Sequence, residues 1–337
     1  IRDSSDPVGA GSNVYFINPR SSYVSLMEYL IQPDTLTEDA ADVSGHCPKL
    51  LPNGKIEMES CVPLDMIIMF SDGDPDSIYI YKYYWAGNDK PQSAWTKHTF
   101  NGTIHSMGLI NTQLYLTLDR NGEVTFEKIE LENAIYEDGL YVDNLDFIVH
   151  LDQQLRLQGT YDIQTGYTTF TLPYKPNMTT MRIINAQTGF ILSKAAIDED
   201  LKTVSVHGNY EGPYHFIGKE YTSTYEFSEW YPKDQQGLAI VDAKLQVRGM
   251  TISYDTTGEF VFRVTPYGRD PYETHFSGIK LGSSIIGAYT LLTGEKYFGV
   301  LAKSKLLKVE ILSDSYLPVQ LISAAWEGYL VERSQRS

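Results

Sequence analysis

Aspartates at alternate positions give this sequence its nearest approach to a metal-binding loop. Asp72, Asp74 and Asp76 resemble the opening of a calcium loop, in which alternate carboxylates hold the ion. An EF-hand also needs glycine at the sixth position and glutamate at the twelfth, where this chain has Ser77 and Tyr83. We therefore interpret these aspartates as parts of a solvated turn, and we predict no metal-ligating residues.

The residues that could act as nucleophiles also lack suitable neighbours. His46 is adjacent to Cys47, but adjacent side chains on a strand point to opposite faces, which suits Cys–His catalysis poorly. Ser283 follows Gly282 without forming the Gly-x-Ser-x-Gly motif of a nucleophile elbow. Cys47 and Cys61 are too far apart for a redox pair, so we predict two free thiols in a reducing cytoplasm. The sequence predicts neither catalytic residues nor a cofactor.

Carboxylates near aromatic residues leave one enzymatic alternative open. Glu226, Glu229 and Asp234 lie in a stretch that is rich in tyrosine and tryptophan. Glycoside hydrolysis needs two carboxyl groups at a defined separation, which a sequence alone does not give. A glycan hydrolase, or a glycan-binding module without catalysis, therefore stays as the alternative to a structural role.

The charge of the chain argues against tight binding of nucleic acid. The 337 residues have a formal net charge of −16, and an acidic surface repels phosphates. Such a surface would suit a wall that DNA passes without sticking. The basic residues Lys303, Lys305 and Lys308 are close together, and we interpret them as one solvated strand rather than a docking patch. No apolar run approaches the roughly 18 residues of a membrane helix.

The first part of the chain has the pattern of a partial β-propeller. Tyrosine is abundant, at 25 residues, and short apolar runs alternate with turn residues, which favours strands. We expect a buried strand over 64–70, a half-exposed strand over 77–85, and a hairpin at Asn121-Gly122. The sets of strands recur at spacings near forty residues, as propeller blades do. We predict two or three blades within 1–132, too few to close a ring.

The second part of the chain, 133–337, is predicted to be an antiparallel β-sandwich or platform-like domain. The acidic, glycine-containing segment 136–146 marks the boundary, and Asp255-Thr256-Thr257-Gly258 is interpreted as a hairpin turn. The expected strands cover 147–157, 168–172, 181–184, 203–207, 221–227, 239–254, 259–265 and three or four further strands within 281–330.

Four blocks of residues, in this order and spacing, resemble the tail tubular protein B, or nozzle, family of T7-like short-tailed bacteriophages. Each block is weak alone, and together they extend from near residue 14 to the C-terminus. The blocks are Asn18-Pro19-Arg20-Ser21; 41–48 with 51–54; 78–85 with 92–95; and 225–228 with 245–254, 281–283, 311–314 and Trp326-Glu327-Gly328.

This resemblance implies a structural, non-enzymatic protein of the virion tail, assembled in the host cytoplasm. It implies a homo-hexameric ring below a tail adaptor ring of tail tubular protein A, with tail fibres as further partners. Phage DNA would leave through the channel of this ring without specific binding. The family members are longer than this chain, which starts with Ile1 rather than methionine. We therefore expect the remaining blades to lie upstream.

Overall fold

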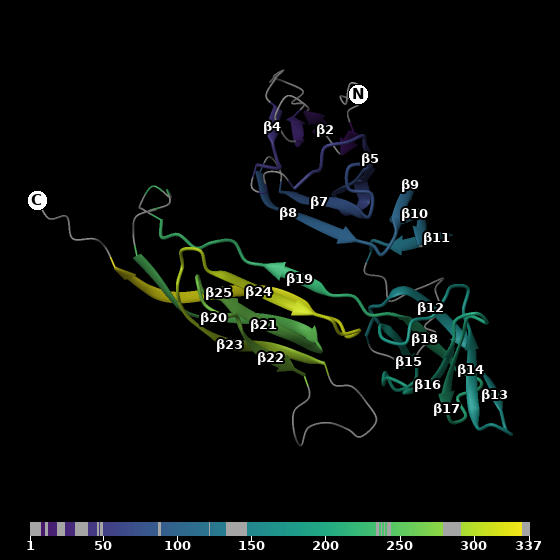
Figure 1. Ribbon diagram of the computed structural model, residues 1–337. Helices are drawn as coiled ribbons and strands as arrows, with labels where there is room; N and C mark the ends of the chain where they lie inside the picture. Colours follow the sequence, from purple (N-terminus) through teal and green to yellow (C-terminus); the bar gives the residue numbers. More distant parts are fainter. Residues whose placement is uncertain are drawn as a thin grey trace, which may run out of the picture. The chain divides into compact units, whose positions relative to one another are not determined.

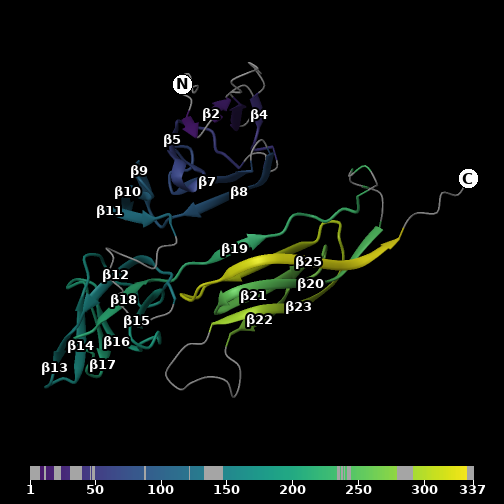
Figure 2. The same cartoon turned by 180° about the vertical axis from the view of Figure 1, so that it is seen from behind.

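A computed structural model gives an all-β protein, as the sequence predicted (Figures 1 and 2). It describes residues 8–10, 13–18, 24–30, 40–45, 47, 50–86, 89–120, 122–132, 147–233, 236, 238, 240, 244–278 and 291–331. Within these ranges every element is a strand except one 3-10 turn, η1 (Val62–Leu64). The named strands pair antiparallel throughout. The chain divides into two compact units, Ile1–Ala134 and Ile135–Ser337.

The first unit consists of three sheets in which consecutive strands are neighbours. The first sheet contains β1 (Val8–Ala10), β2 (Asn13–Asn18), β3 (Ser25–Leu30) and β4 (Ala40–Asp42). The second contains β5 (Ile56–Cys61), β6 (Met66–Ser71), β7 (Ser77–Ala86) and β8 (Asp89–Thr99). The third contains β9 (Thr103–Ile110), β10 (Gln113–Arg120) and β11 (Glu123–Glu130). None of these described sheets closes on itself, so the propeller stays a prediction.

The central strands of the second sheet, β6 and the first half of β7, are buried on both faces. Ile67 and Tyr81 pack on the side of the first sheet, whereas Ile68 and Ile80 pack with Leu116 of the third sheet. The prediction of a buried strand over 64–70 is confirmed from Met66 on, because all six residues of β6 are buried, whereas Leu64 belongs to η1. The prediction that 77–85 is half exposed is wrong for 77–81, which are all buried, and is confirmed from Tyr81 on, where buried and exposed residues alternate. Tyr79 and Tyr81 bury their large rings while their hydroxyl groups keep polar partners.

The first half of the second unit is a small two-sheet sandwich with its own core. One sheet contains β12 (Asp152–Gln158), β15 (Met181–Asn185) and β18 (Tyr214–Lys219). The other contains β13 (Thr160–Asp162), β14 (Tyr167–Thr171), β16 (Lys194–Asp198) and β17 (Thr203–His207). Both sheets contribute to one apolar cluster that includes Phe170, Val204 and Ile217. A Cβ atom at Gly159 would lie 2.3 Å from Thr168 Cγ2, so the crossing from β12 to β13 requires glycine.

The second half of this unit is a larger sandwich. Its four-stranded sheet contains β19 (Ser223–Glu226), β24 (Lys308–Ser313), β21 (Glu259–Thr265) and β22 (Tyr272–Ser277). Its three-stranded sheet contains β23 (Leu292–Lys303), β20 (Lys244–Thr257) and β25 (Gln320–Val331). Phe262 and Phe298 stack across the interior with ring centroids 4.5 Å apart, and they join the two sheets in one core.

The predicted hairpin at 255–258 is wrong, because β20 and β21 belong to different sheets. The Thr257 hydroxyl donates to the Asp255 carbonyl at 2.8 Å and accepts from the Gln320 amide at 3.1 Å. Gly258 donates to the Pro318 carbonyl at 2.9 Å. The turn residues therefore carry the chain between the two layers. The predicted boundary at 136–146, Asn121 and 281–290 lie outside the described residues.

Candidate functional site

The aspartates that suggested a calcium loop are engaged by donors of the protein itself. Residues 72–76 form turns, as predicted. Asp72 Oδ1 accepts a hydrogen bond of 2.6 Å from the Lys55 amide. Asp76 Oδ1 accepts one of 2.8 Å from the Ser77 hydroxyl. These contacts anchor the turn between β6 and β7, which explains the spacing without an ion.

Asp74 is the most strongly perturbed carboxylate of this turn. Its Oδ2 atom accepts hydrogen bonds from the Tyr79 hydroxyl and from Lys97 Nζ, the latter at 2.8 Å. Burial would raise the pKa of Asp74, but the hydrogen bonds from Lys97 and Tyr79 outweigh it and lower this pKa to about 2. Burial and the carboxylate of Asp74 raise the pKa of Tyr79 to about 12. The hydrogen bonds of Asp74 with Tyr79 and Lys97 therefore hold the turn against strands β7 and β8.

The variant Asp74→Asn should flatten the acid dependence of stability. Because the folded pKa of about 2 lies below the ordinary 3.8, the carboxylate stabilises the fold above pH 3.8, and this contribution is lost as the pH falls toward 2. Urea unfolding at several acidic pH values measures the slope. Lys97→Met, which removes a hydrogen bond to the same carboxylate, should flatten the slope as well. An unchanged slope in both variants would contradict the assignment.

Neither cysteine has the lowered thiol pKa of a catalytic nucleophile. Burial, with a contribution from the charge of Asp42, raises the pKa of the Cys47 thiol. Burial also raises the pKa of Cys61, whose sulfur lies 3.5 Å from the Asn111 carbonyl oxygen. Both thiols are protonated at neutral pH, whereas a nucleophilic cysteine needs a lowered pKa. His46 lies outside the described residues.

The glutamates of the glycan alternative hold the edge of the larger sandwich. Glu226 Oε2 lies 3.2 Å from Lys308 Nζ. Glu229 accepts a hydrogen bond of 3.1 Å from the Leu306 amide and another from the Tyr231 hydroxyl. Asp234 lies outside the described residues. Both described carboxylates have a role in fixing strand β19 and the turn at 304–307.

The interpretation of the lysine cluster as one strand is wrong. Lys303 ends β23, Lys305 lies in a turn, and Lys308 begins β24, which belongs to the other sheet. Ser304 and Leu307 are buried where the chain crosses between the layers. The alternation of apolar and basic residues therefore reflects a crossover.

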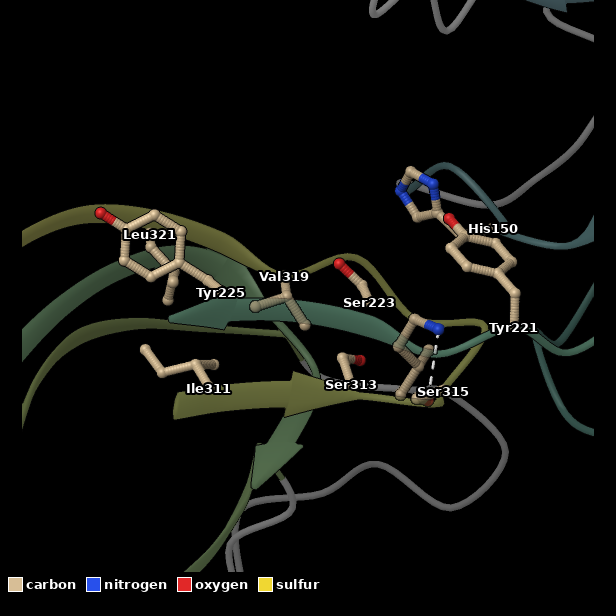
Figure 3. A pocket seen from close by; sticks show the side chains of 10 residues that line it. His150, Tyr221, Ser223, Tyr225, Ile311, Ser313, Ser315, Val319 and Leu321 are labelled. Atoms are coloured by element: carbon tan, nitrogen blue, oxygen red, sulfur yellow. Dashed lines mark hydrogen bonds between the residues drawn. The ribbon is translucent and has the colours of Figure 1, made fainter. Parts of the chain in front are cut away.

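A shallow cavity of about 260 Å³ opens at one side of the larger sandwich (Figure 3). Tyr225 and Leu321 lie at one end of the view, and His150 and Tyr221 lie at the other. Burial lowers the pKa of His150, so its imidazole is neutral at physiological pH. The lining contains no charged side chain at that pH; it consists of His150, Tyr221, Ser223, Tyr225, Ile311, Ser313, Ser315, Leu317, Val319 and Leu321. The cavity suits a neutral, partly apolar group.

The outward face of the third sheet carries exposed apolar side chains among polar ones. The register pairs Gln113 with Ile110 and Thr117 with Phe126. Ile110 and Phe126 therefore lie on the face of the sheet that is turned away from the buried Leu116. Ile110 is 61% exposed and Phe126 is 74% exposed. Surfaces of this kind mark contacts with other protein. Sequence reasoning missed this face, although β11 has exposed apolar side chains alternating with polar ones.

The described residues contain no group of three or more His, Cys, Asp or Glu side chains placed to hold a metal ion. Among the same residues, no helix is long and apolar enough to span a membrane.

The sequence is similar to a known protein family and to a tail protein of a bacteriophage. The sequence pattern described as "Bacteriophage nozzle protein" matches residues 1–337. The chain is also similar to the tail tubular protein gp12 of Escherichia phage T7, with 28% identity over 354 residues. That alignment covers 99% of this chain and 44% of the T7 protein, so the chain spans less than half the length of this relative.

Proposed function

Because the chain belongs to the bacteriophage nozzle protein family and is thus a structural component of a phage tail, we propose that it is a subunit of a hexameric nozzle. The genome passes through the channel of this ring during ejection. The observation that carries the proposal is the family match over the whole chain. The all-β architecture agrees with a mechanical role, since its sheets are layered around continuous apolar cores.

The first unit supports a propeller within this nozzle. Its three sheets follow one another along the chain, and the central strands β6 and β7 of the middle sheet contribute side chains to apolar clusters on both faces. Propeller blades pack face to face in the same way. The exposed outer face of the third sheet, around Phe126, is then the place where a further blade packs. The remaining blades come from parts of the protein that this chain does not include.

The partners follow from the same proposal. The ring sits below a tail adaptor ring of tail tubular protein A, contacts the tail fibres, and is part of the virion tail after assembly in the host cytoplasm. The net charge of −16 supports a channel wall to which DNA does not bind, because an acidic surface releases no counterions from DNA. The glycan alternative gains no support from Glu226 and Glu229, because both carboxylates are engaged in the fold.

Electron microscopy of purified tails tests the proposal. We expect density for this fold in a ring of six copies that encloses a channel on the tail axis. A position outside the tail axis, or density without a ring, would contradict it. New reducing ends after incubation of the pure protein with host glycans, lost on Glu226→Gln, would favour the enzymatic alternative.

A further inference from the structure

Strand β25 is a long edge strand that is exposed on both faces. It is hydrogen-bonded to β20 on one side, and it is the last strand of its sheet within the described residues. Every residue from Ile322 to Leu330 is exposed, with Ile322 at 64% and Tyr329 at 61%. Natural proteins protect such edges with short strands, lysines, prolines or a covering segment. β25 has 12 residues and includes neither lysine nor proline.

The two flanks of the larger sandwich differ in how they are closed. On the β22–β23 flank, the Tyr272 hydroxyl donates to the Val300 carbonyl, which ties the edge strands of the two sheets together. On the opposite flank, β19 and the beginning of β25 both line the cavity of about 260 Å³ (Figure 3). The first flank is therefore tied by a hydrogen bond, whereas the second, called the open flank below, contains the cavity and is bridged by the ring contact of Trp230 with Trp326.

Aromatic rings continue along the open flank. Tyr225 contacts Phe227 with ring centroids 4.9 Å apart, and Phe227 is followed by Trp230 at 6.2 Å. Trp230 then lies 6.4 Å from Trp326 of β25. Tyr225 is 56% exposed and Trp326 is 39% exposed. Tryptophan and tyrosine are enriched at the energetic centres of protein interfaces, so this row can contribute affinity beyond backbone hydrogen bonds.

The charge of the open flank indicates which partner covers it. Two copies of a chain with net charge −16 repel each other wherever their carboxylates face. Within 322–330 the charged residue is Glu327, which lies 3.7 Å from Arg248 and accepts a hydrogen bond of 3.1 Å from Tyr297. On the β19 side, Glu226 is paired with Lys308 at 3.2 Å, and Glu229 accepts a hydrogen bond from the Leu306 amide. A nucleic acid would bind to a basic surface, and a basic protein would bind to an acidic one. A second copy of this acidic chain needs a surface without excess charge, because like charges would repel it.

We propose that the open edge of β25 is a contact between neighbouring copies of this chain. An extended segment of one copy adds to the sheet beside β25 of the next, and its side chains enter the flank cavity. At a rise of about 3.3 Å per residue, β25 offers an edge about 40 Å long. A ring built from identical copies closes through a contact of this head-to-tail kind. The inference rests on the proposed function, because it assigns the surface through which the ring assembles.

Photo-crosslinking tests this contact in the assembled protein. A photoreactive phenylalanine analogue replaces Tyr329 in a ring assembled from unlabelled and ¹⁵N-labelled copies. We expect cross-linked peptide pairs that carry one peptide of each label. A ring seen by electron microscopy without mixed-label pairs would overturn the contact and leave the nozzle proposal standing. A protein that stays monomeric would overturn both. Mixed-label pairs from a smaller oligomer would support the contact and count against the hexamer.

Two lysine variants give an independent measurement. Ile322→Lys and Tyr329→Lys should each weaken self-association about tenfold or more in sedimentation experiments, since each places a charge in a desolvated contact. Leu201→Lys is the matched control, because Leu201 is 70% exposed and belongs to the smaller sandwich. Unchanged thermal unfolding shows that the variants are folded. Equal self-association of all three variants and the parent chain would overturn the proposal.

Discussion

Replacing Lys90 by methionine is expected to destabilise the first unit by about 3–5 kcal/mol. Lys90 Nζ lies 2.5 Å from Glu28 Oε2, and the two side chains are 19% and 4% exposed. The same ammonium group donates to the Tyr81 hydroxyl at 3.0 Å and lies 5.5 Å from the centroid of the Trp85 ring. Lys90 belongs to β8 and Glu28 to β3, so the pair joins two sheets. The variant leaves the Glu28 carboxylate in the interior without this cation.

Urea unfolding followed by tryptophan fluorescence measures this loss. Lys55→Met is the matched control, since it removes an ion pair with Glu57 whose side chains are 64% and 41% exposed, and it should cost at most about 1 kcal/mol. The double variant Glu28→Gln, Lys90→Met should regain part of the loss, because the two residues are coupled. Equal effects of the buried and exposed variants would contradict the assigned role.

The same pair predicts a loss of stability at alkaline pH. Burial would lower the pKa of Lys90, but the hydrogen bonds to Glu28 and Tyr81 outweigh it and raise this pKa above the ordinary 10.5. The contribution of the pair is therefore complete below pH 10.5 and lost as the pH rises through the folded pKa. The difference between the parent chain and Lys90→Met should shrink over that alkaline range.

The sequence predicted the strands well where one apolar run made one strand. The runs over 104–110, 113–118 and 203–207 correspond to β9, β10 and β17. Strand β18 was missed, although it is the central strand of its sheet. Its glycine, Gly218, weakens the strand pattern, and it is there because a Cβ atom would lie 2.8 Å from the Asp152 carbonyl oxygen. The requirement for glycine at 218 thus comes from Asp152, which is distant in sequence.

The pairing of strands and the exposed faces could not be predicted in the same way. The turn residues at 255–258 fit a hairpin and a crossover between layers equally, and tertiary packing of Thr257 decides between them. Ile110 and Phe126 share a face only through the register of three strands. Each residue alone looks like an ordinary member of an alternating strand. A surface made by register has no local signature in the chain.

Tyr316 joins the two sandwiches of the second unit, and Tyr316→Ala should cost about 3–5 kcal/mol. Its side chain is 2% exposed and packs in a cluster with Val149 and Ile184. The hydroxyl donates to the Gly189 carbonyl at 2.8 Å, and the Tyr316 carbonyl accepts from the His150 amide at 2.8 Å. A segment between β24 and β25 of the larger sandwich thus inserts into the smaller one.

The variant Tyr316→Phe separates packing from hydrogen bonding at this junction. It keeps the ring and removes the donor from the buried Gly189 carbonyl, so it should cost about 1–3 kcal/mol. Tyr267→Ala, at a position that is 75% exposed, is the control and should have little effect. Calorimetry should show that Tyr316→Ala divides a single unfolding transition into two, because the sandwiches keep separate cores. A transition that stays single would mean that contacts other than those of Tyr316 couple the unfolding of the two sandwiches.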